Sequence, residues 1–93
     1  MNHPASPCVV YVLSCRDGSL YVGWTTDLPK RLAQHRAGTG SRYVRSRLPV
    51  ELRASWAVAS RGAALRDEAR FRRLRRPQKL ALLAGRAAPS GPF

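Results

Sequence analysis

The sequence is poor in carboxylates. Its 93 residues hold five Asp and Glu against 17 Lys and Arg, which gives a formal net charge of +12. Asp17 suits a turn, Asp27 a helix cap and Glu51 the entrance to a strand, so Asp67 and Glu68 remain as candidate metal ligands. A two-metal site usually needs several acidic oxygens around its paired ions. The composition therefore excludes a typical two-metal centre and leaves room for one metal ion at most.

Cysteine motifs and long apolar runs are missing as well. Cys8 and Cys15 lack the CxxC spacing and have no accompanying His/Cys cluster, which argues against a zinc site or a thioredoxin-like motif. No stretch approaches the ~20 apolar residues of a membrane span, and residues 1–7 lack the charged and apolar regions of a signal peptide. We therefore expect a cytoplasmic protein.

Arginine is what the chain has in excess. All the basic residues except Lys30 and Lys79 are Arg, whose planar donor fork binds phosphate oxygens two at a time. The charge therefore predicts a polyanionic partner. The alternative is that the charge only keeps the protein in solution.

The length accommodates one small domain. Residues 1–7 contain two prolines and predict a disordered N-terminus, while the Gly, Pro and Ala of residues 84–93 predict a flexible C-terminal tail. The folded domain is expected over residues 8–83.

The first half of this domain carries strand and helix signals in turn. Two β-branched and aromatic runs, residues 9–13 and 20–24, flank the turn sequence Arg16-Asp17-Gly18 and predict a β-hairpin. Asp27 then predicts the cap of a helix that tolerates Pro29 in its first turn and ends at the glycines of residues 38–40.

The second half completes an α+β pattern. Residues 38–49 predict a loop, and residues 50–59 predict a third strand. A helix over residues 63–76, stopped by Pro77, and a last short helix over residues 78–84 follow. The predicted element order is ββαβαα.

Five polar positions in this order resemble the GIY-YIG endonuclease family. They are Tyr11 in Val9-Val10-Tyr11, Tyr21 in Tyr21-Val22-Gly23, Arg31, His35 and Glu68. The segment 25–28, the sequence Lys30-Arg31-Leu32 and Ala64-Leu65-Arg66 are similar, more narrowly, to the small stand-alone bacterial subgroup. The ordered set is specific, whereas the two tyrosine triplets alone are weak.

The resemblance implies a fold, an activity and a set of roles. The fold is a small three-stranded antiparallel sheet flanked by helices, and the activity is hydrolysis of DNA phosphodiester bonds with one divalent ion, Mg²⁺ or Mn²⁺, held by Glu68. Tyr11 is expected to be the base or to orient the water, with Tyr21 as its partner at the phosphate. Arg31 is expected to clamp the phosphate, and His35 to help deprotonate or orient the tyrosine.

Two departures from the family pattern concern the tyrosine triplets. Val9-Val10-Tyr11 stands where the family has Gly-Ile-Tyr, which a strand tolerates. Trp24 stands where some relatives, notably excision-repair nucleases, carry Lys, so one activator of the phenol is missing. This absence puts more weight on His35.

Further side chains are expected to bind nucleic acid through its backbone or by stacking. They are Trp24, Lys30, Arg42, Tyr43, Arg45 and Arg72. No helix-turn-helix, zinc-finger or RNA-recognition signature is present to read bases. The substrate is therefore expected to be recognised by structure or as a single strand, with little sequence specificity, in a repair or processing role.

Simpler interpretations exist for each position. Tyr11 and Tyr21 can be cross-strand aromatics, and Glu68 can pair with Arg72 at i,i+4. Helical phase does not separate Asp67 from Glu68, and only the family resemblance selects the second. A non-catalytic nucleic-acid-binding module and a partner-activated nuclease subunit remain as alternatives to an enzyme.

The hairpin loop decides whether the two tyrosines can act together. With a two-residue turn at Asp17-Gly18, Tyr11 lies opposite Trp24 and the tyrosines point to opposite faces. With a three-residue loop, Leu13 pairs with Tyr21 and both tyrosines share one face. The joint site therefore requires the odd-length loop or a bulge.

Overall fold

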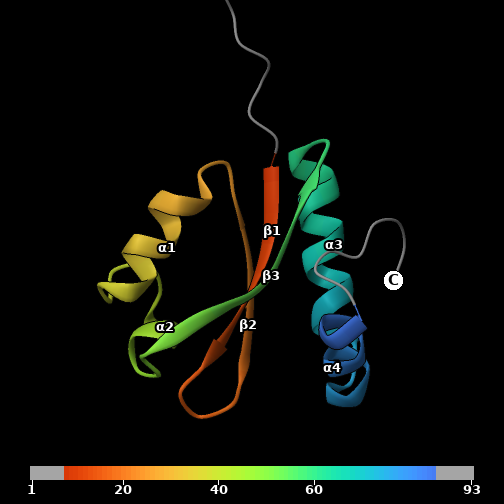
Figure 1. Ribbon diagram of the computed structural model, residues 1–93. Coiled ribbons are helices and arrows are strands. Elements are labelled where there is room, and N and C mark those ends of the chain that lie inside the picture. Colours follow the sequence, from red (N-terminus) through yellow and green to blue (C-terminus); the bar gives the residue numbers. More distant parts are fainter. Residues whose placement is uncertain (1–7, 86–93) are drawn as a thin grey trace, which may run out of the picture.

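The computed structural model describes residues 8–85, which form a three-stranded sheet with helices on both sides (Figure 1). The elements are β1 (Cys8–Cys15), β2 (Leu20–Thr25), α1 (Leu28–Arg36), α2 (Arg42–Arg45), β3 (Val50–Val58), α3 (Arg61–Arg73) and α4 (Arg76–Gly85). The predicted α+β architecture is confirmed. The short helix α2 was not predicted and lies within the expected loop, where Ser41 Oγ accepts the Val44 N–H.

The predictions of a disordered N-terminus and a flexible C-terminal tail concern mainly residues outside the described part of the chain. Residues 1–7 and 86–93 lie outside the described residues. The last helix, expected over residues 78–84, extends to Gly85 as α4. Among residues 8–85, no helix has the length and hydrophobicity that crossing a bilayer requires.

The sheet has the strand order β2-β1-β3 and both pairings are antiparallel. Because β1 is central, alternate side chains enter two separate cores. Val10 and Val12 pack with Phe71 under α3 and α4, while Tyr11 and Leu13 pack on the side of α1 and α2. Figure 1 shows the two helical layers on opposite sides of the sheet.

The hairpin register confirms the three-residue loop. Leu13 lies opposite Tyr21 and Tyr11 lies opposite Gly23. Gly18 has a left-handed backbone, with φ of 86°, and its N–H donates to the Cys15 carbonyl over 2.9 Å. Tyr11 and Tyr21 therefore share the face of the sheet that α1 covers.

The boundary between α3 and α4 corrects the sequence-based prediction. The helix was expected to continue to residue 76 and stop at Pro77, but α3 ends at Arg73 and Leu74 has extended backbone. Pro77 is instead the second residue of α4, where its missing N–H leaves no helical bond unmade. The Gln78 side chain accepts the Arg75 N–H over 2.8 Å and so supports the new helix start.

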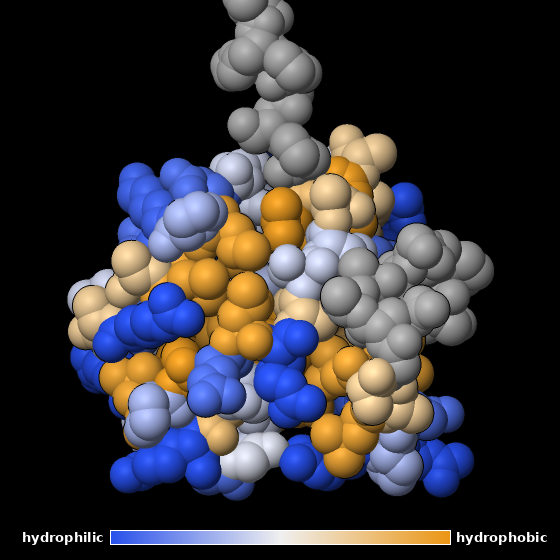
Figure 2. Space-filling model, viewed as in Figure 1, coloured by the Kyte–Doolittle hydropathy of each residue, from blue (hydrophilic) through white to orange (hydrophobic). Residues whose placement is uncertain are grey.

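The surface on the β3 side is amphipathic. In the view of Figure 2, hydrophobic side chains gather between α1 and the start of β3, and hydrophilic ones surround them. There Arg36, Leu48, Pro49 and Val50 line a pocket of about 470 Å³. The pocket therefore lies near the β3 edge of the sheet. The opposite edge is formed by β2, the more distant strand in Figure 1.

The loop glycine gives the first testable prediction. Gly18→Ala should lower the free energy of unfolding by about 1 kcal/mol, because a Cβ there meets no atom within 4 Å and only the left-handed backbone opposes it. Gly18→Asn should cost less, since Asn adopts this conformation more readily. The measurement is urea denaturation, with Gly62→Ala in α3 as a control that leaves stability unchanged or raised. If Gly18→Ala and the wild type have the same free energy of unfolding, the left-handed backbone assigned to Gly18 is contradicted.

Candidate active site

A buried hydrogen bond joins the central strand to α1. The Tyr11 hydroxyl lies 2.8 Å from His35 Nε2, and both side chains are almost completely buried. Two glycines make room for the pair. A Cβ on Gly23 would lie 2.7 Å from the Tyr11 hydroxyl oxygen, and one on Gly40 would lie 2.5 Å from His35 Nδ1. The sequence analysis used Gly40 only as a helix terminator, so its packing role was missed.

Burial keeps both members of this pair uncharged. Desolvation raises the pKa of the Tyr11 phenol well above its ordinary value, with the neighbouring Tyr21 adding to the shift and Arg31 opposing it. Desolvation also lowers the pKa of His35, and the Arg31 charge lowers it further. At neutral pH the hydrogen bond therefore joins a neutral phenol to a neutral imidazole. The other ring nitrogen, Nδ1, is buried and has no hydrogen-bond partner among the described residues.

Tyr21 extends the site from the buried pair toward the surface. Its ring centroid lies 6.4 Å from that of Tyr11 and 5.4 Å from that of His35. Its other neighbour is Tyr43, stacked at 5.9 Å, and the Arg47 guanidinium covers the Tyr43 ring at 3.8 Å. Tyr43 is thus held by two aromatic and cationic contacts while it remains exposed at the surface.

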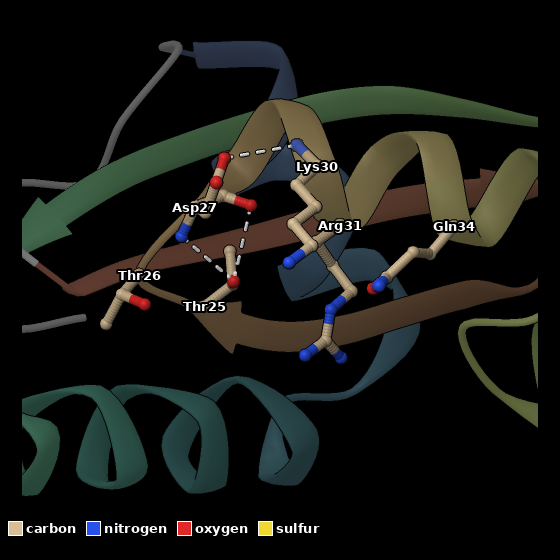
Figure 3. A pocket seen from close by; sticks show the side chains of 6 residues that line it. All are labelled: Thr25, Thr26, Asp27, Lys30, Arg31 and Gln34. Atoms are coloured by element: carbon tan, nitrogen blue, oxygen red, sulfur yellow. Dashed lines mark hydrogen bonds between the residues drawn. The ribbon is translucent and has the colours of Figure 1, made fainter.

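Arg31 reaches the site from the first turn of α1. Asp27 caps this helix by accepting the Lys30 N–H over 3.2 Å. Arg31 and Lys30 then line an open pocket of about 320 Å³ with Thr25 and Gln34 (Figure 3). Since Arg31 lowers the pKa of the Tyr11 phenol, its charge acts directly on the buried pair.

The structure separates the two neighbouring acids of α3. Asp67 Oδ2 accepts the Trp56 indole N–H over 2.9 Å and is thereby held against the sheet. Glu68 instead lies 3.3 Å from Arg72, with its side chain 16% exposed. Its negative charge contributes to raising the pKa of Tyr11. The two acids thus differ in their contacts, a difference that sequence periodicity does not show.

The donor set has limited capacity for a metal. No group of three or more His, Cys, Asp and Glu side chains among residues 8–85 could hold an ion. Mg²⁺, however, commonly keeps several waters and binds through one or two carboxylates together with substrate phosphates. Glu68 alone fits that manner of binding and not a closed protein cage.

The other predicted binding residues are divided among several places. Trp24 packs against the core under α3, with Arg61 5.5 Å from its ring, so it lies on the opposite face from Tyr11. Arg42 and Arg45 line a separate pocket of about 270 Å³. Arg72 lines a groove beside β2, together with Tyr43 from the predicted set and Lys79, which was not predicted.

This fold and site define a GIY-YIG catalytic domain. The family model of that description matches residues 7–81, and the chain belongs to this family. More particularly, it is similar to the UPF0213 proteins, small chains that include one from Streptococcus pneumoniae, 51% identical over 85% of this chain and 77% of that protein.

Two solved structures resemble the chain as a whole. One is the solution NMR structure of a UPF0213 protein from Bacillus halodurans, with 40% identity, a TM-score of 0.58 and coverage of 88% of this chain and 87% of that one. The other is the solution NMR structure of a protein from E. faecalis, with 31% identity, a TM-score of 0.59 and coverage of 100% and 99%.

The depressed pKa of His35 predicts a pH-dependent stability. The unfolded chain takes up a proton near the ordinary pKa of 6.5, whereas the folded His35 does not. The free energy of unfolding should therefore fall as the pH is lowered from about 7.5 to about 5.5. Urea denaturation at these pH values should show a smaller fall for His35→Gln, which cannot titrate. Equal pH dependence in the two proteins contradicts the prediction.

Proposed function

We propose that this chain is a metal-dependent endonuclease that hydrolyses phosphodiester bonds in nucleic acid, with DNA as the substrate. Residues 8–83 carry the nuclease domain. The observation that supports this proposal most strongly is the buried Tyr11–His35 hydrogen bond, with Arg31 and Glu68 beside it. A purely structural cross-strand tyrosine does not need a buried histidine partner.

The first chemical requirement is removal of a proton from the attacking water. With its raised pKa, Tyr11 is a poor base by itself. In our proposal its oxygen accepts the water proton while its own proton passes to His35 Nε2, 2.8 Å away. The result is hydroxide and imidazolium, and the negative charge of the bound phosphate offsets the burial of that cation.

The second requirement is positive charge at the phosphate. Arg31 is assigned to the non-bridging oxygens, because it lines an open pocket at the start of α1 (Figure 3) and its charge acts on the Tyr11 phenol. Tyr21 is assigned to positioning the same phosphate, from the same face of the sheet as Tyr11. Glu68 is assigned to holding the divalent ion. Mg²⁺ or Mn²⁺, when bound, supplies further positive charge to the reacting phosphate.

The recognition that we propose depends on structure and not on base sequence. The basic side chains Lys30, Arg42 and Arg45 lie beside the site or on the neighbouring loop, where they can contact backbone phosphates. Such contacts release counterions and make binding strongly salt-dependent. This favours single-stranded or branched substrates in a repair or processing role.

A second candidate is a nucleic-acid-binding module, or a nuclease subunit that a partner activates. Two features of the free protein favour it. The pKa of Tyr11 is raised, and Glu68 is paired with Arg72. Incubating the purified protein with labelled single-stranded, duplex and branched substrates, in Mg²⁺, Mn²⁺ or EDTA, tests both candidates. Binding without metal-dependent cleavage of any substrate favours the module.

The roles of Arg31 and Glu68 give a quantitative prediction. Arg31→Ala and Glu68→Gln should each lower the cleavage rate by about two orders of magnitude, because each change removes one charge from the transition state. Single-turnover cleavage of the best substrate measures the effect, and circular dichroism checks the fold. Asp67→Asn is the matched control and should retain activity, since Asn can still accept from Trp56. An inactive Asp67→Asn beside an active Glu68→Gln would move the metal ligand to Asp67.

A further inference from the structure

A groove outside the tyrosine pair runs along β2 and is lined by two cations. Its volume is about 240 Å³, and its basic residues are Arg72 from α3 and Lys79 from α4. Leu20, Val22 and Phe71 form an apolar floor, and no carboxylate lines the groove. Although Arg72 is also paired with Glu68, the two basic side chains make this concave surface complementary to an anion.

The groove is continuous with the candidate active site at two points. Tyr21 lines the groove and also lies against Tyr11 and His35. Arg72 lines the groove and also contacts Glu68 at 3.3 Å. A strand bound at the active site can therefore extend directly into the groove.

Lys79 is held in place although it has no anionic partner among residues 8–85. The Arg76 guanidinium donates to the Gly18 carbonyl over 2.8 Å and so ties the start of α4 to the hairpin loop. The half-buried Lys79 then lies with its ammonium 5.5 Å from the Phe71 ring centroid. The ion pairs found among residues 8–85 are Arg47–Asp17 and Arg72–Glu68, and neither includes Lys79.

The backbone of β2 adds hydrogen-bond donors to this groove. Cys15 N–H donates to the Ser19 carbonyl, so Ser19 and every second residue after it bond toward β1. Leu20 and Val22 therefore direct their N–H groups away from β1. Within the described residues β2 pairs with no other strand, and Leu20 and Val22 both line the groove.

We propose that this groove binds the phosphodiester group next to the scissile one on the same nucleic-acid strand. Lys79 and Arg72 contact its phosphate oxygens, and the outward N–H groups of Leu20 and Val22 are further donors. The inference rests on the proposed function, because it assumes that a nucleic-acid strand occupies the site. It adds Lys79 as a binding residue that acts one nucleotide away from the chemistry.

The test compares thymidine oligonucleotides that carry one or two phosphodiester groups. In EDTA and at low salt, NMR titration of the ¹⁵N-labelled wild type should show tighter binding of the trinucleotide than of the dinucleotide, on the order of tenfold. The Leu20 and Val22 amide signals should shift with the trinucleotide. Lys79→Gln, which keeps most of the side-chain stem, should lose this gain.

Arg70→Gln is the matched control. It removes one positive charge from an exposed position. Because Arg70 precedes Arg72 by two residues, the two side chains project to different sides of α3. This variant should keep the gain from the second phosphate. Lys79→Arg provides a second test, because it retains the charge and should restore most of the gain.

The outcomes separate this inference from the proposed function. If Lys79→Gln and Arg70→Gln both keep the tenfold gain, the groove is not a phosphate site, although cleavage by the wild type still supports the nuclease. If both variants lose it equally, general charge explains the binding and the groove proposal fails. If the wild type neither binds the oligonucleotides nor cleaves any substrate, both proposals fail.

Discussion

The hydrogen bond between Tyr11 and His35 is the contact on which the arrangement of this site depends. It forms in the core between the central strand and α1, where neither side chain is exposed to water. Close packing by Gly23 and Gly40 leaves no space for a side chain at either position. The polar chemistry is therefore part of the packing itself, and contact with the two rings, not backbone conformation, is what requires glycine at these positions.

The charges of the molecule are arranged around this uncharged pair. Arg31 on one side lowers the pKa of the phenol, while Tyr21 and the more distant Glu68 act in the opposite direction. The chain has five acids, and Glu68 is the one whose charge contributes to the pKa of the phenol. A phosphate that enters the site supplies negative charge close to the surrounding arginines.

Much of the site could be predicted from the sequence, and the limits have physical reasons. Tyr11, Tyr21, Arg31 and His35 do come together, because the hairpin loop has an odd number of residues and α1 covers that face. Helical phase placed Asp67 and Glu68 equally well, and only the tertiary structure shows that Asp67 accepts a hydrogen bond from Trp56 whereas Glu68 pairs with Arg72. Pro77 was misassigned because proline both ends helices and begins them.

The sequence by itself determined the element order, the excess of positive charge and the scarcity of carboxylates, since these follow from local patterns and composition. It also predicted that both tyrosines share one face if the loop has three residues, because strand side chains alternate. The tertiary structure decided which partner each of the two acids contacts, which glycine packs on the histidine, and that Lys79 joins Arg72 beside β2. These are contacts between segments far apart in the chain, and no local pattern carries information about such distances.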